Sequence, residues 1–205
     1  MKSWQELKGT DNIGLVIGNG PSLNEIPIEF LKKYPSFGTN KIFLLDGFTP
    51  TYYVSVDPVA IDPFIDDIAK MDCKKFLRAS YVKNLLADAF PLHSSTIPAF
   101  SRHPDQWVYE GHTVTFVCLQ LAFFMGFKTV VLVGVDHNYQ DDESANYFHS
   151  DYTKDVEGWH KPDMMQAELA YNMAKTVYEW EGRRIVNLTP FTALDVFEKG
   201  DIAEW

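Results

Sequence analysis

Two kinds of apolar pattern alternate along the chain: short runs of β-branched or aromatic residues, and longer segments with helical spacing. This alternation is typical of a mostly parallel sheet covered by helices on both faces. The predicted strands are residues 13–17, 52–56, 75–79, 129–133 and 184–187. We therefore predict a Rossmann-like α/β fold.

Two helices stand out in the second half of the chain. Residues 112–125, "HTVTFVCLQLAFFM", are apolar almost all round and precede Gly126, which predicts a buried helix closed by a C′ glycine. Pro162 can occupy the first position of the next helix, and Gly182 can end it. The apolar side chains of that helix recur every four residues, at Met165, Leu169, Met173 and Val177. We expect this row to face the core.

One long connection, residues 140–160, lacks a regular pattern and is polar and acidic. Such a segment inside a compact domain is usually a functional loop or a disordered one. Its aromatic content argues against disorder, because disordered linkers are poor in aromatic residues. The aromatic residues are Tyr147, Phe148, Tyr152 and Trp159. We predict a lid loop over a binding site.

Composition limits the domain organisation and the partners. With 205 residues, 46% of them hydrophobic, the chain can form one sizeable core and falls short of a second domain, so residues 1–205 are predicted to form one domain. The net charge of -10 argues against binding to nucleic acid, which needs clustered Lys and Arg. No apolar run reaches the roughly 18 residues of a membrane span. Peripheral contact is the most that the sequence allows with a membrane.

The two cysteines, Cys73 and Cys118, form no CxxC motif, and the start "MKSWQELKG" contains no secretory apolar stretch. Disulfides are therefore not expected, and a cytoplasmic location is favoured. The sequence does not set the oligomeric state, and a homo-oligomer stays open.

The first predicted strand stops on "GNGPS", residues 18–22. Ligands of open α/β sheets lie outside the carboxyl ends of the strands, so the N–H groups of this turn could face an anion such as a phosphate. Gly18 and Gly20 would permit positive φ and close approach, and Ser22 could cap the following helix. The turn matches neither GxGxxG nor a Walker loop, which disfavours a dinucleotide enzyme and a P-loop ATPase. A purely structural turn is equally compatible with the pattern.

Three further apolar runs end on side chains that can form hydrogen bonds. "FGTN" ends on Asn40, "YYVSVDP" reaches Asp57, and "VVLVGVD" ends on Asp136. One such residue is ordinary turn chemistry. Together with the glycine turn, these strand ends predict a common site.

The motifs "IGNGPSL", "GTNKIF", "YYVSVDP", "GFKTVVLVGVD" and "WHKPD" occur in this order from about residue 15 to residue 194. The chain thereby resembles a family of archaeal 6-hydroxymethyl-dihydropterin pyrophosphokinases and motility-associated flagellin glycosyltransferases. It is also similar to bacterial CMP-sialic-acid-dependent sialyltransferases. The motifs are specific for this superfamily but do not separate its reactions.

The resemblance implies a set of nucleotide contacts: Gly18, Asn19, Gly20, Pro21, Ser22, Asn40, Asp57, Thr113 and Asp136. Asp57 stands where the sialyltransferases carry an Asn, so it could instead bind a sugar hydroxyl or a metal. Thr113 takes the place of a Ser, although a shift of one residue would put Val114 there.

The resemblance also implies the catalytic residues. His160 matches a general base that takes the proton of an acceptor hydroxyl, and an imidazole with a pKa near 6.5 can do so at neutral pH. Tyr139, with Tyr147 or Tyr152, matches tyrosines that bind the leaving phosphate, which neutral donors can stabilise. His149 is a candidate for substrate contact from the lid, with a metal ligand or a solvated residue as alternatives.

Three functions follow as hypotheses. The first is a glycosyltransferase that moves a nonulosonic-acid-type sugar from a nucleotide donor, most simply CMP-linked, to a hydroxyl acceptor, with no cofactor required. The second is a pyrophosphokinase that acts on 6-hydroxymethyl-dihydropterin with Mg²⁺-ATP, the metal being held by Asp57, Asp136 and the acidic residues 141–143. The third is a non-catalytic module that binds a nucleotide sugar.

Overall fold

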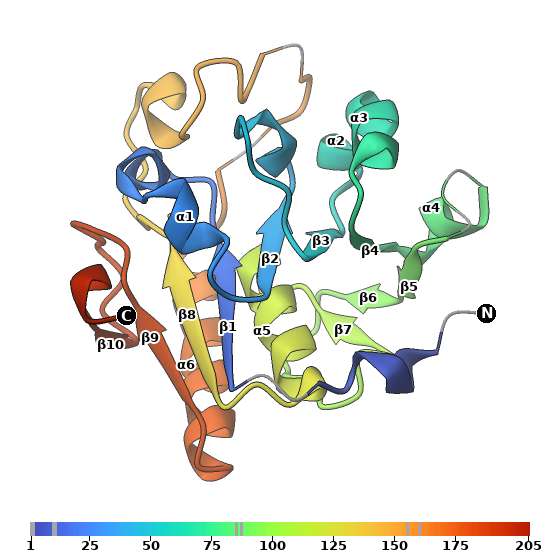
Figure 1. Cartoon of the computed structure of the whole chain (residues 1–205). Coiled ribbons are helices and arrows are strands. Elements are labelled where there is room, and N and C mark those ends of the chain that lie inside the picture. Colours follow the sequence, from blue (N-terminus) through green and yellow to red (C-terminus); the bar gives the residue numbers. More distant parts are fainter. Residues whose placement is uncertain (1–2, 10–11, 85, 87, 155, 160) are drawn as a thin grey trace.

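A computed structural model describes residues 3–9, 12–84, 86, 88–154, 156–159 and 161–205. Eight strands form one sheet in the order β10-β9-β8-β1-β2-β3-β4-β5, and every neighbouring pair in it is parallel (Figure 1). The strands are β1 Ile13–Ile17, β2 Ser36–Thr39, β3 Tyr52–Ser55, β4 Lys74–Arg78, β5 Phe90–Leu92, β8 Thr129–Val133, β9 Arg184–Asn187 and β10 Glu198–Lys199. A small second sheet pairs β6 Ser94–Ser95 with β7 Val108–Tyr109. The predicted parallel α/β fold is confirmed.

The α-helices are α1 Ile28–Leu31, α2 Pro58–Ile61, α3 Ile65–Lys70, α4 Ala79–Asn84, α5 Val114–Met125 and α6 Met164–Trp180. The 3₁₀ helices are η1 Trp4–Leu7, η2 Pro21–Glu25, η3 Ile42–Leu44, η4 Asp62–Phe64, η5 Glu143–Asn146 and η6 Ile202–Glu204. The predicted bounds of β1, β8 and β9 are confirmed, whereas β3 ends one residue early and β4 lies one residue earlier than predicted.

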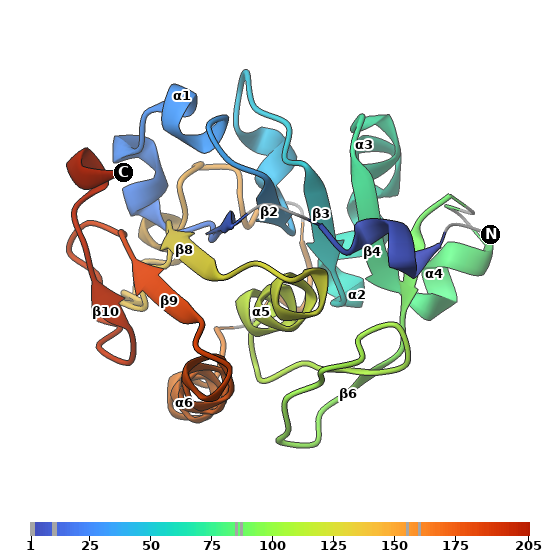
Figure 2. The ribbon, with the colours of Figure 1, turned by 60° about the horizontal axis from the view of Figure 1, so that its bottom comes forward.

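Successive strand residues point to opposite faces of the sheet and build two cores. Val16 and Leu132 lie in the core beneath α5 and α6, and their neighbours Ile17 and Val133 lie in the core on the other face. Figure 2 shows α5 and α6 on one side of the strands and α1 on the opposite side.

Helix α5 is buried along almost its whole length, as predicted, and Gly126 closes it at φ 99°. Its one buried amide, Gln120, has no exposed surface. Gln120 accepts hydrogen bonds from the Ser101 and Tyr109 N–H groups, both at 3.0 Å, and donates to the Tyr109 carbonyl at 2.7 Å. A buried amide needs such partners, and these attach the chain around β7 firmly to α5.

The predicted face of α6 is wrong in its first two turns, where Met165 and Leu169 are 71% and 56% exposed. Residues four apart drift by about 40° per step around a helix of 3.6 residues per turn, so a strict four-residue row leaves the core. The buried face consists of Ala167, Ala170, Tyr171, Ala174 and Tyr178. Pro162 also precedes the helix instead of opening it, because Asp163 is the N-cap.

Within the described residues, no helix is long and apolar enough to cross a membrane. Cys73 and Cys118 are both free thiols.

Candidate functional site

A pocket of about 490 Å³ opens at the carboxyl edge of the sheet. That volume lies within the range of about 300–1,000 Å³ that is usual for ligand sites. Five adjacent strands, in the order β8-β1-β2-β3-β4, each deliver a pocket residue just after or at their carboxyl end. These residues are Asp136, Asn19, Asn40, Asp57 and Arg78. Since neighbouring strands are about 4.8 Å apart, this row spans about 19 Å.

The glycine turn lines the pocket, but its hydrogen bonds differ from the prediction. The Gly18 N–H donates to the Val133 carbonyl at 2.8 Å and the Gly20 N–H to the Gly134 carbonyl at 2.9 Å. These N–H groups are therefore engaged by the loop after β8 and do not face an anion. Neither glycine has positive φ; Gly20 has φ −71°. What the turn requires is close approach, because a Cβ at Gly18 would lie 2.4 Å from the Gly134 oxygen.

Two further residues of the turn have structural contacts. Ser22 does not cap a helix; its hydroxyl donates to Asp136 Oδ2 at 2.7 Å, and its N–H donates to Asp136 Oδ1 at 3.2 Å. Pro21 and Ser22 lie outside the pocket lining, in contrast to Gly18 and Gly20.

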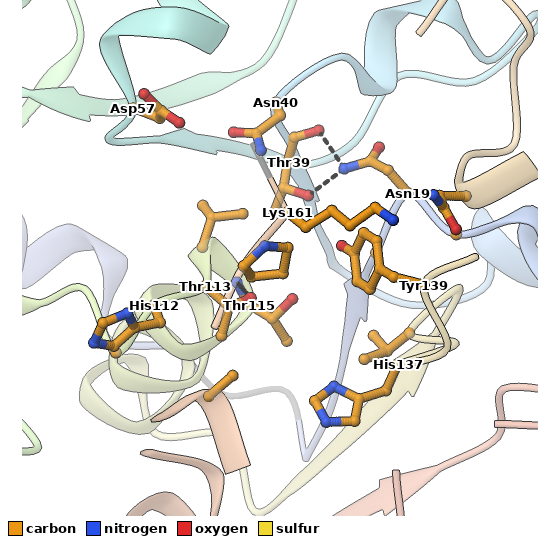
Figure 3. Close-up of a pocket in the computed structure, with 18 of the residues that line it drawn as sticks. Asn19, Thr39, Asn40, Asp57, His112, Thr113, Thr115, His137, Tyr139 and Lys161 are labelled. Atoms are coloured by element: carbon orange, nitrogen blue, oxygen red, sulfur yellow. Dashed lines mark hydrogen bonds between the residues drawn. The ribbon is translucent and has the colours of Figure 1, made fainter. Parts of the chain in front are cut away.

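Asn19 and Asn40 bring amide groups to the middle of the row (Figure 3). Asn19 Nδ2 donates to Thr39 Oγ1 at 2.8 Å and to the Thr39 carbonyl at 3.1 Å, while its Oδ1 is buried without a partner in the described part of the chain. Asn40 has φ 46°, and its Oδ1 accepts a hydrogen bond from the Ser55 hydroxyl at 3.0 Å. Its amide nitrogen has no partner among the residues that the structure describes, so it can donate to a ligand.

The N-termini of α5 and α6 both reach the pocket, but their caps differ. Thr113 caps α5 with a neutral hydroxyl that accepts from the Thr115 N–H, and the first turn of α5 contains no acidic residue. Asp163 caps α6 with a carboxylate that accepts from the Gln166 N–H at 3.1 Å. The positive end of a helix dipole attracts anions. The Asp163 carboxylate offsets this positive charge in α6, whereas no acidic residue of the cap or first turn offsets it in α5. The N-terminus of α5 therefore offers the better anion site.

Residues 140–159, here called the strap, carry aromatic rings to the β8 end of the pocket. Tyr147 stacks on Tyr152 with ring centroids 4.1 Å apart, and the Trp159 indole N–H donates to the Tyr147 hydroxyl at 2.6 Å. Tyr139 contacts Tyr147 edge to face at 6.3 Å. All four line the pocket.

The strap is folded onto the sheet edge. The Phe148 N–H donates to the Asn19 carbonyl at 3.0 Å, and the buried Lys41 ammonium donates to the carbonyls of Asp151 and Tyr152 at 3.1 and 2.7 Å. The described part of the predicted loop thus forms a wall of the pocket, and its anchors come from the turn after β1 and from the residue that follows Asn40.

Burial raises the pKa of Tyr139 well above its ordinary value, so its hydroxyl stays protonated at neutral pH and can donate a hydrogen bond. Burial also raises the pKa of Tyr152, which is 1% exposed and whose hydroxyl is hydrogen-bonded to the Lys41 backbone. Tyr139 is hydrogen-bonded to Tyr147, another residue of the pocket wall, whereas Tyr152 is bonded to the buried backbone, so Tyr139 is the better placed of the two to act on a ligand.

The candidates His149 and His160 and a third histidine, His137, differ in position. His137 lines the pocket at φ 54°, with Nε2 3.1 Å from Glu168 Oε1. His149 does not line the pocket, and its Nδ1 accepts a hydrogen bond from the Asp151 N–H at 3.1 Å. His160 lies outside the described residues, while its chain neighbours Trp159 and Lys161 both line the pocket.

Three charged groups of the site, Arg78, Glu110 and Lys161, were not among the predicted residues. Arg78 ends β4, and the same strand-end pattern that pointed to Asp136 would have found it. Its Nη2 lies 3.0 Å from Glu110 Oε1, which follows β7 and carried no recognisable pattern. Lys161 also lines the pocket and donates to the Gln140 carbonyl at 2.6 Å.

The two carboxylates proposed for a metal differ in availability. Both oxygens of Asp136 accept hydrogen bonds from Ser22, whereas Asp57, among the described residues, uses only Oδ1, for the Val59 N–H at 3.0 Å. No group of three or more His, Cys, Asp or Glu side chains among the described residues is arranged to hold a metal ion. Asp57 thus has the more available carboxylate of the two for a cation that is shared with substrate phosphates.

Fold and pocket together define a Rossmann-like α/β protein with a pocket at the carboxyl ends of its central strands. The chain belongs to the family described as 6-hydroxymethylpterin diphosphokinase MptE-like, whose model matches residues 2–142. That match covers the five strand ends and α5, and it stops within the strap. No curated protein sequence matches the chain significantly.

The fold is similar to that of the sialyltransferase CstII from Campylobacter jejuni. One CstII structure, in complex with the substrate analogue cytidine-5'-monophosphate, aligns with a TM-score of 0.56 and 14% identity over 93% of this chain and 86% of CstII. A second, with CMP-3FNeuAc, aligns with a TM-score of 0.54 and 13% identity over 92% and 85%. At this identity the likeness shows a shared fold.

Proposed function

We propose that this protein is a glycosyltransferase that moves a nonulosonic-acid-type sugar from a CMP-linked donor to a hydroxyl acceptor. The observation that carries the proposal is the middle of the pocket, where the uncompensated N-terminus of α5 meets uncharged donors from Asn40 and Tyr139. These groups suit the phosphodiester of the donor, which carries a single negative charge, and they can donate hydrogen bonds to the CMP phosphate as it leaves.

The phosphate is placed at α5. Helix N-termini attract anions by about 0.3–1 kcal/mol when exposed and by up to about 2 kcal/mol when partly buried. The nucleoside then extends toward β8, where the strap supplies the rings of Tyr147 and Trp159, since every base has a face that can stack on aromatic side chains.

The chemistry requires one base and one or more donors. The acceptor oxygen attacks the anomeric carbon, its proton passes to the base, and the bond from that carbon to the phosphate oxygen breaks with CMP taking the electron pair. Tyr139, kept protonated by burial, donates to the departing phosphate. We assign the base to His160 on the sequence motif, with its neighbours in the pocket wall as support.

The family name supports a second candidate, a diphosphokinase that transfers a diphosphate from ATP to a hydroxymethylpterin. Mg²⁺ would neutralise the ATP phosphates there, and Asp57 is the carboxylate that could hold it. The hydrogen bonds from Ser22 to both oxygens of Asp136 weigh against this candidate, because they engage one of the two carboxylates that were expected to hold the metal.

A thermal-shift series with CMP, CDP and ATP, each in Mg²⁺ and in EDTA, tests the proposal. Stabilisation by CMP in both buffers is expected for the glycosyltransferase. Stabilisation by ATP in Mg²⁺ alone would overturn it in favour of the diphosphokinase. If the protein binds CMP but neither hydrolyses a CMP-linked donor nor transfers its sugar under any condition, it is a non-catalytic binding module.

The base assignment has its own test. His160→Ala should abolish transfer and leave CMP binding unchanged, while His149→Ala, outside the pocket wall, should leave transfer within about twofold. Full activity of His160→Ala would remove His160 from the mechanism.

A further inference from the structure

The β3–β4 end of the pocket is built differently from the rest. Here the pocket wall carries two carboxylates, Asp57 and Glu110, and one guanidinium, Arg78, instead of aromatic rings. Arg78 is already neutralised by Glu110 at 3.0 Å, so the end as a whole is acidic. A second phosphate or a carboxylate would be disfavoured there by charge.

Hydrogen bonds from neighbouring residues hold this cluster in place. Gln120, fully buried, binds both the N–H and the carbonyl of Tyr109, the residue that precedes Glu110. The Ser94 hydroxyl donates to Glu110 Oε1 at 2.6 Å, and Arg78 Nε donates to the Val56 carbonyl. Five hydrogen bonds thus orient two side chains that are still about a quarter to a third exposed, with values of 24% for Glu110 and 32% for Arg78.

The cluster keeps unused hydrogen-bonding capacity. Asp57 Oδ2 and Glu110 Oε2 have no partner in the described residues, and Arg78 uses only Nε and Nη2. Fixed acceptors beside a fixed donor match vicinal hydroxyl groups, each of which donates one hydrogen bond and accepts others. Hydrogen bonds to charged groups are stronger than those between neutral groups, and so confer specificity.

We propose that Asp57, Arg78 and Glu110 form the acceptor subsite and that the acceptor is an uncharged, polyhydroxylated sugar. The inference rests on the proposed function, because it takes the donor phosphate to lie at α5 and the nucleoside to lie toward β8. The acceptor hydroxyl then approaches the anomeric carbon from the side opposite the nucleoside, along the same row of strand ends.

Saturation-transfer NMR of the full chain with CMP bound tests the subsite. The probes are methyl β-galactopyranoside, methyl β-glucopyranoside and the anionic methyl β-galactopyranosiduronate. We expect the wild type to contact the neutral glycosides and to bind the uronate at least about tenfold more weakly. Glu110→Gln should lower the affinity for the neutral glycosides about tenfold and should reduce the difference in affinity between the neutral glycosides and the uronate. The CMP dissociation constant should be unchanged.

Glu181→Gln is the matched control, because Glu181 forms an Arg–Glu pair with Arg102 at 2.7 Å outside the pocket. It should behave as the wild type does with every probe. The subsite would be overturned if the CMP-bound wild type bound no neutral glycoside, or if Glu110→Gln and Glu181→Gln had equal effects on glycoside binding. The proposed function would stand in that case, because CMP still binds. Failure to bind CMP at all would instead overturn the proposed function.

Discussion

Ser22 and Asp136, 114 positions apart in sequence, form a two-point contact in which the serine N–H and hydroxyl bind the two carboxylate oxygens at 3.2 and 2.7 Å. This contact joins the turn after β1 to the turn after β8. The glycine turn is therefore a packed joint that shapes the pocket, and the ligand-binding groups are the side chains that surround it.

The joint predicts a strict requirement for glycine at position 20. A Cβ there would lie 1.9 Å from Asp136 Oδ2, so Gly20→Ala must displace the turn or the carboxylate. We expect a loss of about 3 kcal/mol in the free energy of unfolding, measured by urea denaturation. Gly9→Ala is the control, since its Cβ would have its nearest neighbour at 3.7 Å, and should change stability by less than about 1 kcal/mol. Equal stability of the two variants would refute the joint.

Asp136 should make the folded protein less stable as the pH rises. Burial raises its pKa above the ordinary 3.8, opposed in part by the Ser22 hydrogen bonds, so the folded state binds its proton more tightly than the unfolded state does. Its contribution to stability is complete below pH 3.8 and is lost as the pH rises through the folded pKa. Urea denaturation across this window should show the wild type losing stability relative to Asp136→Asn. A difference that stays constant with pH would contradict the raised pKa.

The strap should depend on Lys41. Lys41→Met removes the ammonium that binds two strap carbonyls, and we expect a loss of at least about 2 kcal/mol together with faster thermolysin cleavage within residues 140–159. Lys154→Ala is a matched control, because Lys154 meets the exposed Asp151 side chain at 3.8 Å, and it should cost less than about 0.5 kcal/mol. Unchanged cleavage of Lys41→Met would show that the strap is held by other contacts.

Tyr139 should act in catalysis through its hydroxyl. Tyr139→Phe keeps the ring packed against Tyr147 and removes the donor, so kcat should fall about 100-fold with little change in stability. Tyr34→Phe loses a hydroxyl that donates to the Trp205 carbonyl at 3.0 Å, away from the pocket, and should keep its full rate. A normal kcat for Tyr139→Phe would exclude the tyrosine as the donor.

The sheet was predictable because its central strands are buried on both faces, which makes them continuous apolar runs with polar stops. Asn40 and Asp57 could be placed in a site on that basis alone, since the carboxyl ends of parallel strands share one edge. The face of α6 was not predictable from its large apolar residues, because small alanines pack against α5 and leave Met165 outside.

The hydrogen bonds of the glycine turn were beyond the sequence for another reason. Whether an N–H group is free depends on its neighbours in space, and the partners of Gly18 and Gly20 lie on β8, more than a hundred residues away. Glu110 was hidden in the same way, because its pairing with Arg78 arises only when β7 is attached to α5 by Gln120.

The most direct test of the central claim is the affinity for CMP in EDTA, measured by isothermal titration calorimetry for the wild type and for Asn40→Asp. This substitution keeps the oxygen that accepts from Ser55 and replaces the free amide nitrogen with a negative charge beside the phosphate. We predict that each wild-type chain binds one CMP without metal. The Asn40→Asp variant should be equally stable and should bind CMP at least about tenfold more weakly. The proposed function would be contradicted if the wild type did not bind CMP and bound ATP only when Mg²⁺ is added.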